Sequence, residues 1–237
     1  MTVAHDWKIE LDETEILKNQ GGALSRILAK DSGRKSWREA LVEARDLVQP
    51  AAAWDCIPVK EIRHERVFLA GGAFLAGGSS FGGGPVATVV AGASDLVMAV
   101  CTVGNAIGSR IKEHQRARRL LTGVLLDELG TWAVDVLRRE LCRRLQDEAA
   151  AAGLRVSTSL SPGESEWPLS DQAVIFSVVD AARIGVSLSP SMIMSPLKSL
   201  SLIMGRGSRP LGREGGEHCD YCAMRERCTY RCRSARA

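Results

Sequence analysis

The stretch Asp95-Leu-Val-Met-Ala-Val-Cys-Thr-Val-Gly104 ends the longest apolar segment of the chain, which begins at Val86. A short apolar run that closes on small residues is typical of a strand buried on both faces of a sheet. Asp95 and scattered Gly, Ser and Thr make the whole segment too polar for a membrane-spanning helix. The sequence therefore predicts a buried strand here and no membrane segment.

Segments with helical spacing lie on both sides of this strand. Apolar residues recur at steps of three and four between residues 9 and 49, which predicts two or three short helices. The same spacing from Leu121 to Leu145 predicts a long amphipathic helix that packs on the sheet and ends at Gly153. The pairs Arg138-Arg139 and Arg143-Arg144 are expected on its solvent face.

Shorter pieces complete the expected architecture. Leu169 to Ile184 predicts a further helix, Pro85 predicts the start of a short one, and Pro50 and Pro58 are expected to bracket a loop. The glycines of residues 71–84 are expected in turns, because no Gly-Lys-Ser/Thr follows them as in a phosphate loop. Short strands are expected at 67–70, 186–188, 192–194 and 200–204. The predicted fold class is mixed α+β.

The composition fits a globular protein that builds its own core. The chain has 237 residues, of which 45% are hydrophobic and 25% charged, enough for one substantial domain or two small ones. The mean hydropathy of -0.03 excludes collagen-like, low-complexity and membrane classes. Because the first residues show no basic region followed by an apolar run, we expect a cytoplasmic protein.

The charge is concentrated at the C-terminal end. The segment Gly205–Ala237 holds eight Arg and four acidic residues, while the preceding residues are close to neutral. A basic tail can bind nucleic acid, an anionic cofactor or an acidic protein, or it can simply be a solvated terminus. We therefore predict two parts, a body at 1–204 and a basic, cysteine-rich, metal-binding tail at 205–237.

Four of the seven cysteines crowd into this tail, and such clusters in a reducing compartment are candidate metal sites. They are Cys219, Cys222, Cys228 and Cys232. The compact spacing Cys-x2-Cys-x5-Cys-x3-Cys favours a 4Fe-4S cluster, with zinc as the alternative and a site with fewer ligands or no metal as a third reading. The neighbouring His218 could replace one thiolate, although a lone His beside such a cluster is more often incidental. The isolated cysteines, expected to be small buried side chains, are Cys56, Cys101 and Cys142.

Familiar catalytic arrangements are missing from the sequence. The four His stand singly, and His-Glu-x-x-His does not occur. No catalytic residue is therefore assigned. A nucleic-acid-binding module with a zinc knuckle is disfavoured, because Tyr221 and Tyr230 are the aromatic residues near the tail's charge.

The section from Ser161 to Ser199 carries a resemblance to a known family. Its residues include Ser161-Pro-Gly163-x-x-x-Trp167-Pro-Leu169 and, after a helix, Ile184-Gly-Val-x-Leu188-x-x-Ser191-Met-x-Met194-x-Pro196-x-Lys198-Ser199. This section resembles the activation domain of cobalamin-dependent methionine synthase, particularly its stand-alone bacterial relatives. Cys101-Thr-Val-Gly104 and Cys228-Thr-Tyr-Arg231 resemble further elements of that family.

The resemblance implies both a fold and a function. The fold is a curved α+β domain with a twisted antiparallel sheet and flanking helices. The function is an accessory role in reductive activation, in which the domain docks on a corrinoid protein or cobalamin-dependent methyltransferase while S-adenosylmethionine supplies the methyl group. An electron donor protein and an electron relay through the C-terminal cluster would complete this reading. The alternative is an S-adenosylmethionine-binding activation subunit with structural zinc.

The ligand loop departs from the family pattern Arg-x-x-Pro-Gly-Tyr. Ser159 and Glu164 stand where the family has its carboxylate-binding Arg and its Tyr, and Pro162 and Gly163 are retained. Serine cannot form the bidentate pair with a carboxylate, and Glu164 would repel one. These four residues and Lys198 are the candidate ligand-binding residues.

Two further positions enter through the same resemblance. A tyrosine pair of the family is missing, and Arg206 or Arg209 stands near its place. Asp135 falls where a helix carboxylate of the family contacts the ligand, although a solvated helix acid is the simpler reading of that residue.

Overall fold

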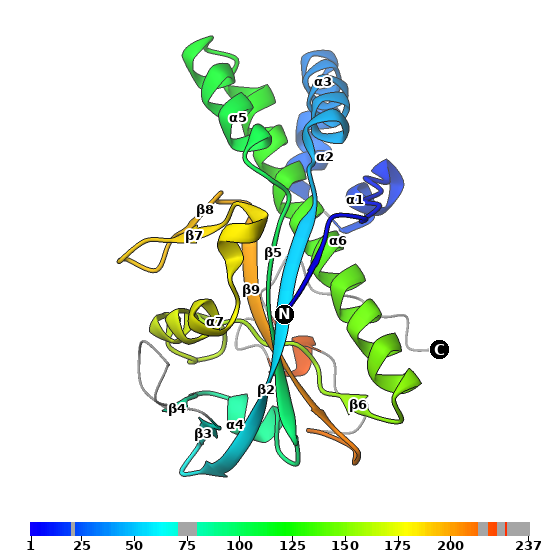
Figure 1. Ribbon diagram of the computed structural model, residues 1–237. Coiled ribbons are helices and arrows are strands. Elements are labelled where there is room, and N and C mark those ends of the chain that lie inside the picture. Colours follow the sequence, from blue (N-terminus) through cyan, green and yellow to red (C-terminus); the bar gives the residue numbers. More distant parts are fainter. Residues whose placement is uncertain (20–21, 71–79, 213–217, 222–225, 227–237) are drawn as a thin grey trace.

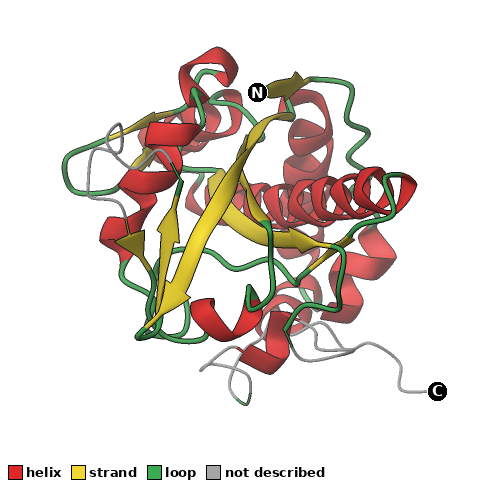
Figure 2. Ribbon diagram, turned by 60° about the horizontal axis from the view of Figure 1, so that its bottom comes forward, coloured by secondary structure: helices red, strands yellow, loops and turns green. Residues whose placement is uncertain are grey.

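Figure 1 shows the computed structural model of the chain, which describes residues 1–19, 22–70, 80–212, 218–221 and 226. Its main feature is a twisted antiparallel sheet, seen again in Figure 2, with helices packed against it. Within the described residues the sheet has seven strands in the order β4-β3-β2-β5-β9-β6, and β1 pairs with β2. The strands are β1 Thr2–Ala4, β2 Ala51–Arg63, β3 Arg66–Leu69, β4 Ser80–Phe81, β5 Asp95–Thr102, β6 Arg155–Val156 and β9 Ser199–Gly207. The predicted α+β class is confirmed.

Helices cover both faces of this sheet, and a separate hairpin of β7 Ser187–Leu188 and β8 Met194–Ser195 lies beside it. The α-helices are α1 Glu13–Asn19, α2 Gly22–Leu28, α3 Asp31–Leu47, α4 Val86–Val89, α5 Ala106–Arg116, α6 Leu120–Ala151 and α7 Gln172–Val178. The short 3-10 helices are η2 Leu169–Asp171, η3 Ala181–Ile184 and η4 His218–Tyr221. In Figure 1, α2, α3 and α5 project beyond one end of the sheet. Among the described residues no helix is both long and apolar enough to cross a membrane.

The predicted buried strand is confirmed as β5 at the centre of the sheet. It pairs along its whole length with β2 on one side and β9 on the other. Because strand side chains alternate between faces, the two faces of β5 enter different hydrophobic clusters. Val97, Ala99 and Cys101 pack with α3 and α6. Leu96, Met98 and Val100 pack with α4 and α7, so that both faces of the sheet are buried.

Two predictions in this part of the chain are wrong. Residues between Pro50 and Pro58 form most of β2 rather than a loop, because Ala51–Trp54 is buried and Pro58 lies where β2 leaves β5 and begins to pair with β3. The carbonyl of Pro58 accepts a hydrogen bond from the Ala70 N–H at 2.9 Å, so Pro58 takes part in the pairing of β2 as an acceptor. Cys56, expected to be buried, is exposed on this strand.

The other elements follow the sequence more closely. Three helices occupy residues 9–49, and α6 ends before Gly153, whose φ of +71° suits glycine. The helix expected from Leu169 to Ile184 is interrupted, because Val179 is extended between α7 and η3. The boundary expected after residue 204 falls inside β9, and the two-part division of the chain stays a prediction.

A partly buried ionic cluster holds α5 against α3 in the projecting helices. His114 is fully buried, and its Nε2 lies 2.7 Å from Glu43 Oε2. Arg110 donates from Nε and Nη2 to the same carboxylate at 3.0 and 2.9 Å. Burial alone would raise the pKa of Glu43, but hydrogen bonds from Arg110 and His114 outweigh it and lower that pKa.

We expect Glu43→Gln to destabilise the protein at pH 7 by about 2 kcal/mol, because Arg110 loses one of its two carboxylate partners, keeping only Glu113, and His114 loses a charged acceptor. The folded-state pKa of Glu43 is lowered, so the carboxylate's contribution is present above the ordinary value of 4.5 and is lost as the pH falls through the folded-state value. Urea unfolding of both proteins between pH 7 and pH 3 should show the difference in unfolding free energy shrinking. The exposed control Glu10→Gln should show no such trend, and a pH-independent difference for Glu43→Gln would contradict the assignment.

Candidate functional site

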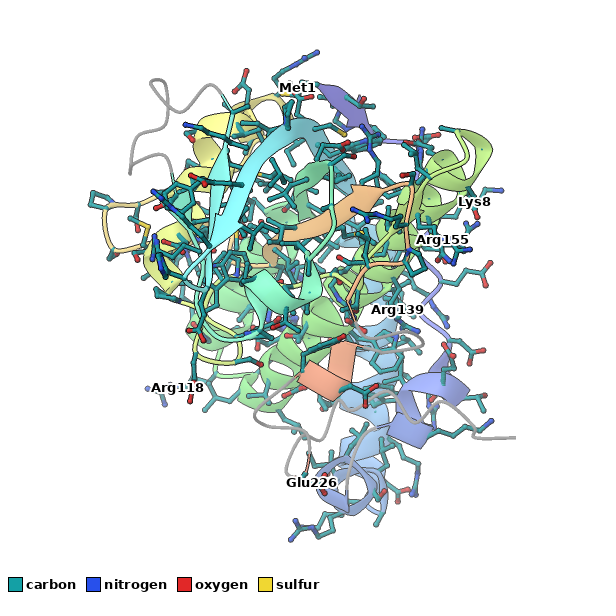
Figure 3. All side chains as sticks on the ribbon, turned by 90° about the horizontal axis from the view of Figure 1, so that it is seen from below. Met1, Lys8, Arg118, Arg139, Arg155 and Glu226 are labelled. Carbon is teal, nitrogen blue, oxygen red and sulfur yellow. The ribbon has the colours of Figure 1, made fainter. Side chains whose placement is uncertain are left out.

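A cleft of about 500 Å³ lies between α6 and the chain that returns from it. Gly153 reverses the chain, so that β6 and residues 157–159 run back along the C-terminal half of α6. The third wall comes from Met204 of β9 and residues 210–212 that follow it. In Figure 3, Arg139 of α6 and Arg155 of β6 lie on the same side of the molecule. The site is therefore formed largely by one helix and its own return strand.

The lining of the cleft is strongly cationic. Four arginines line it and no acidic residue does, among the residues described. They are Arg138, Arg139, Arg143 and Arg155. The neutralising carboxylates lie one helical turn away on α6. Asp135 pairs with Arg138 at 2.8 Å and Arg139 at 3.3 Å, and Arg143 pairs with Glu140 and Asp147 at 2.7 and 3.3 Å.

Ser159 lies in this cleft and contacts a guanidinium. Its side chain is buried, and Arg138 Nη1 donates to its hydroxyl oxygen at 3.2 Å. Arg138 also donates from Nε and Nη2 to Asp135 Oδ1 at 3.1 and 2.8 Å. Burial lowers the pKa of Arg138, but Asp135 outweighs it and the net direction is upward, so this guanidinium is charged.

The expectation that Arg138 belongs to the solvent face of α6 is therefore wrong, since its side chain is 18% exposed. Sequence reasoning missed this residue because a guanidinium next to the helix stripe is usually solvated. The available signal was the serine in the ligand loop, which leaves room for an arginine from another element.

Cys142 lies one turn further along α6, in the same cleft. Burial raises the pKa of its thiol, although a hydrogen bond with Ser159 and the charge of Arg138 act in the opposite direction. A neutral thiol is a poor nucleophile and metal ligand. Cys142 therefore shapes the wall of the cleft. The expected burial is confirmed for Cys101, whereas Cys142 is of intermediate exposure.

The loop at Pro162 to Glu164 follows Ser159 in the chain but does not line the cleft. Gly163 has a φ of +92°, and its N–H donates to the carbonyl of Trp167 at 2.9 Å. A Cβ at this glycine would also lie 3.3 Å from the Leu169 side chain. The Glu164 carboxylate accepts the Ser161 N–H at 3.1 Å, which closes the loop on itself.

Lys198 stands apart from the cleft. Its Nζ donates to Thr131 Oγ1 at 2.8 Å and lies 2.9 Å from Asp127 Oδ1. Asp127 is eight residues before Asp135 on α6, roughly 12 Å along the helix axis. The structure thus brings Ser159 and Asp135 together but ties Lys198 to another part of α6.

The two arginines considered as replacements for the family's tyrosines do not line the cleft. Arg206 donates to Asp95 Oδ1 at 2.6 Å, which joins β9 to β5 at the end of the sheet. Arg209 is exposed.

The predicted metal site lies mostly outside the described residues. Cys222, Cys228 and Cys232 fall outside them, and of Cys219 the structure gives the backbone, in η4. Among the residues that are described, no group of three or more His, Cys, Asp or Glu could hold a metal ion. The same 3-10 helix ends at Tyr221, which lines the cleft and whose carbonyl accepts the Ser165 hydroxyl at 2.5 Å.

Comparison with known proteins identifies the fold. No protein-family model matches the chain, and no curated protein matches its sequence. Among solved structures, a MetH reactivation domain bound to AdoHcy is similar over 79% of this chain and 70% of that one, with a TM-score of 0.56 and 11% sequence identity. The fold expected from the resemblance is confirmed.

Proposed function

We propose that the chain is an accessory protein for reductive activation of a corrinoid-dependent methyltransferase, that it docks on the cobalamin protein, and that it works in the cytoplasm. The shared fold with a MetH reactivation domain supports the proposal. The observation that carries the proposal is the guanidinium group of Arg138, which lies beside Ser159. The resemblance places a carboxylate-binding arginine at this position, and Arg138 brings a guanidinium to 3.2 Å from the serine hydroxyl.

The proposed ligand of the cleft is S-adenosylmethionine or its product, since the similar reactivation domain binds AdoHcy. Arg138 would bind the ligand carboxylate while Asp135 holds the guanidinium in place from the opposite side. Ser159 would orient the same guanidinium through its hydroxyl group. Pro162, Gly163 and Glu164 would support this arrangement as the frame of the loop.

Lys198 is a weaker candidate within the proposal. Its ammonium group already has Asp127 and Thr131 as partners and is 14% exposed. We therefore propose that Lys198 fastens the segment before β9 to α6, and that ligand contact comes from the arginines.

The proposed electron relay depends on the C-terminal cysteines. Their spacing favours a 4Fe-4S cluster held by Cys219, Cys222, Cys228 and Cys232, with structural zinc as the alternative. A bound cluster would supply one-electron transfer. Arg225, Arg227, Arg231 and Arg233 lie between or beside these ligands and would offset the negative charge of four thiolates.

We expect the full-length chain to bind AdoHcy in calorimetry and Arg138→Gln to weaken that binding at least tenfold, about 1.4 kcal/mol. Arg138→Lys should fall between the two, because an ammonium group keeps the charge but not the bidentate geometry. The matched control is Arg183→Gln, an exposed arginine on η3 outside the cleft. Equal affinity of Arg138→Gln and the control, with unchanged circular dichroism, would contradict the ligand assignment.

Protein prepared without oxygen should contain about four iron and four sulfide per chain and show sulfur-to-iron charge-transfer absorption. Replacing all four clustered cysteines by serine should remove both, while Cys56→Ser, an exposed cysteine outside the tail, should keep both. One equivalent of zinc without iron would support the structural alternative. Absence of both metals would contradict the relay.

The accessory role has its own assay. A corrinoid methyltransferase in its cob(II)alamin form should lose the absorbance of that state when S-adenosylmethionine and a reductant are supplied with the chain. The reaction should slow when Arg138→Gln replaces the chain, because the methyl donor is held less tightly. No acceleration by the unmodified chain with several corrinoid proteins would contradict the accessory role.

A further inference from the structure

The cationic cleft has more positive charge than a single ligand carboxylate requires. Arg138 and Arg139 share one carboxylate, Asp135. Arg155 makes no ion pair with any residue that the structure describes, although it lines the cleft. Arg139 Nε is buried without a hydrogen-bond acceptor, since its approach to Asp135 is an ion pair without hydrogen-bond geometry. The Nε of Arg139, which lacks a hydrogen-bond acceptor, and the guanidinium group of Arg155 point to a second anionic group in the ligand.

The two ends of the cleft differ in how firmly their arginines are held by neighbouring side chains. At one end Arg138 is held by Asp135 and Ser159. Toward the C-terminal end of α6, Arg143 is 64% exposed and pairs with exposed carboxylates. Such exposed pairs contribute little, so a bound anion can replace them. Because the return strand runs antiparallel to α6, Arg155 lies nearer to this second end than Ser159 does.

The size and the remaining lining describe the rest of the ligand. A volume of about 500 Å³ is much larger than an inorganic ion and is within the range of small-molecule sites. The rest of the lining is mixed, with Gln146, Ser157 and Thr158 as polar members. The apolar side chains are Val89, Val156, Met204, Pro210 and Leu211. A fitting ligand therefore joins an apolar or flat body to a compact anion.

We propose that the cleft binds a phosphate ester of about nucleotide size, with its phosphate between Arg143 and Arg155 and its body on the apolar wall. Phosphate matches two guanidinium groups better than a carboxylate does, because it has more acceptor oxygens and more charge. The inference does not rest on the proposed function. It depends on the charge and dimensions of the cleft and would stand if AdoHcy did not bind.

The test uses AMP, adenosine and inorganic phosphate as probes with the full-length chain in calorimetry at physiological salt. AMP should bind at least tenfold more tightly than either of the other two. The double variant Arg143→Gln/Arg155→Gln should weaken AMP binding at least tenfold, and Arg155→Lys should weaken it less. The double variant Arg38→Gln/Arg183→Gln, at two exposed arginines outside the cleft, serves as the control of equal charge change.

Each alternative outcome overturns the proposal. Adenosine binding as tightly as AMP would show that the phosphate is not recognised, and phosphate binding as tightly as AMP would show that the body is not. An equal loss of AMP affinity in the double variant and in a protein with two exposed arginines replaced elsewhere would indicate that AMP is attracted by net charge alone. AdoHcy titrations of the same variants separate the two proposals, since AdoHcy binding should depend on Arg138 and AMP binding on the Arg143 and Arg155 pair.

Discussion

Burial of β5 on both faces and along both edges is the constraint on which the rest of the structure depends. Every second side chain of the strand packs under α6, and the intervening ones pack under α4 and α7. A one-residue shift of its register would exchange the two sets. Pairing with β9 therefore also fixes Met204 in the wall of the cleft, and the helix above β5 fixes the arginines opposite.

The elements that could be predicted are those with a strong local signal. The β5 run, the apolar spacing of α6 and the glycine after α6 each determine structure within a few residues. The strand β2 was missed because Pro58 marks a loop in most sequences. Here the strand changes its hydrogen-bonding partner at that residue, which is a property of the sheet and not of the local chain.

The residues of the candidate site, too, could be predicted from the sequence only in part. Ser159 was expected from its place in the loop, and it lies in the cleft. Arg138 was assigned to solvent, because a single sequence does not show that a buried serine hydroxyl will lie 3.2 Å from its guanidinium. Lys198 has the chemistry of a ligand-binding residue, but Asp127 and Thr131 on α6 already use its ammonium group. Residue type and spacing in the sequence identify candidate ligand-binding residues. Contacts with other elements of the fold determine which of these side chains are free to bind a ligand.

Tyr221 belongs to the wall of the cleft and stands between Cys219 and Cys222 in the chain. The short helix η4 therefore contributes Tyr221 to the cleft and Cys219 to the cysteine-rich tail. An occupant that binds one position of this tyrosine more tightly would also act on the helix that holds the Cys219 backbone, and any such coupling would be thermodynamically reciprocal.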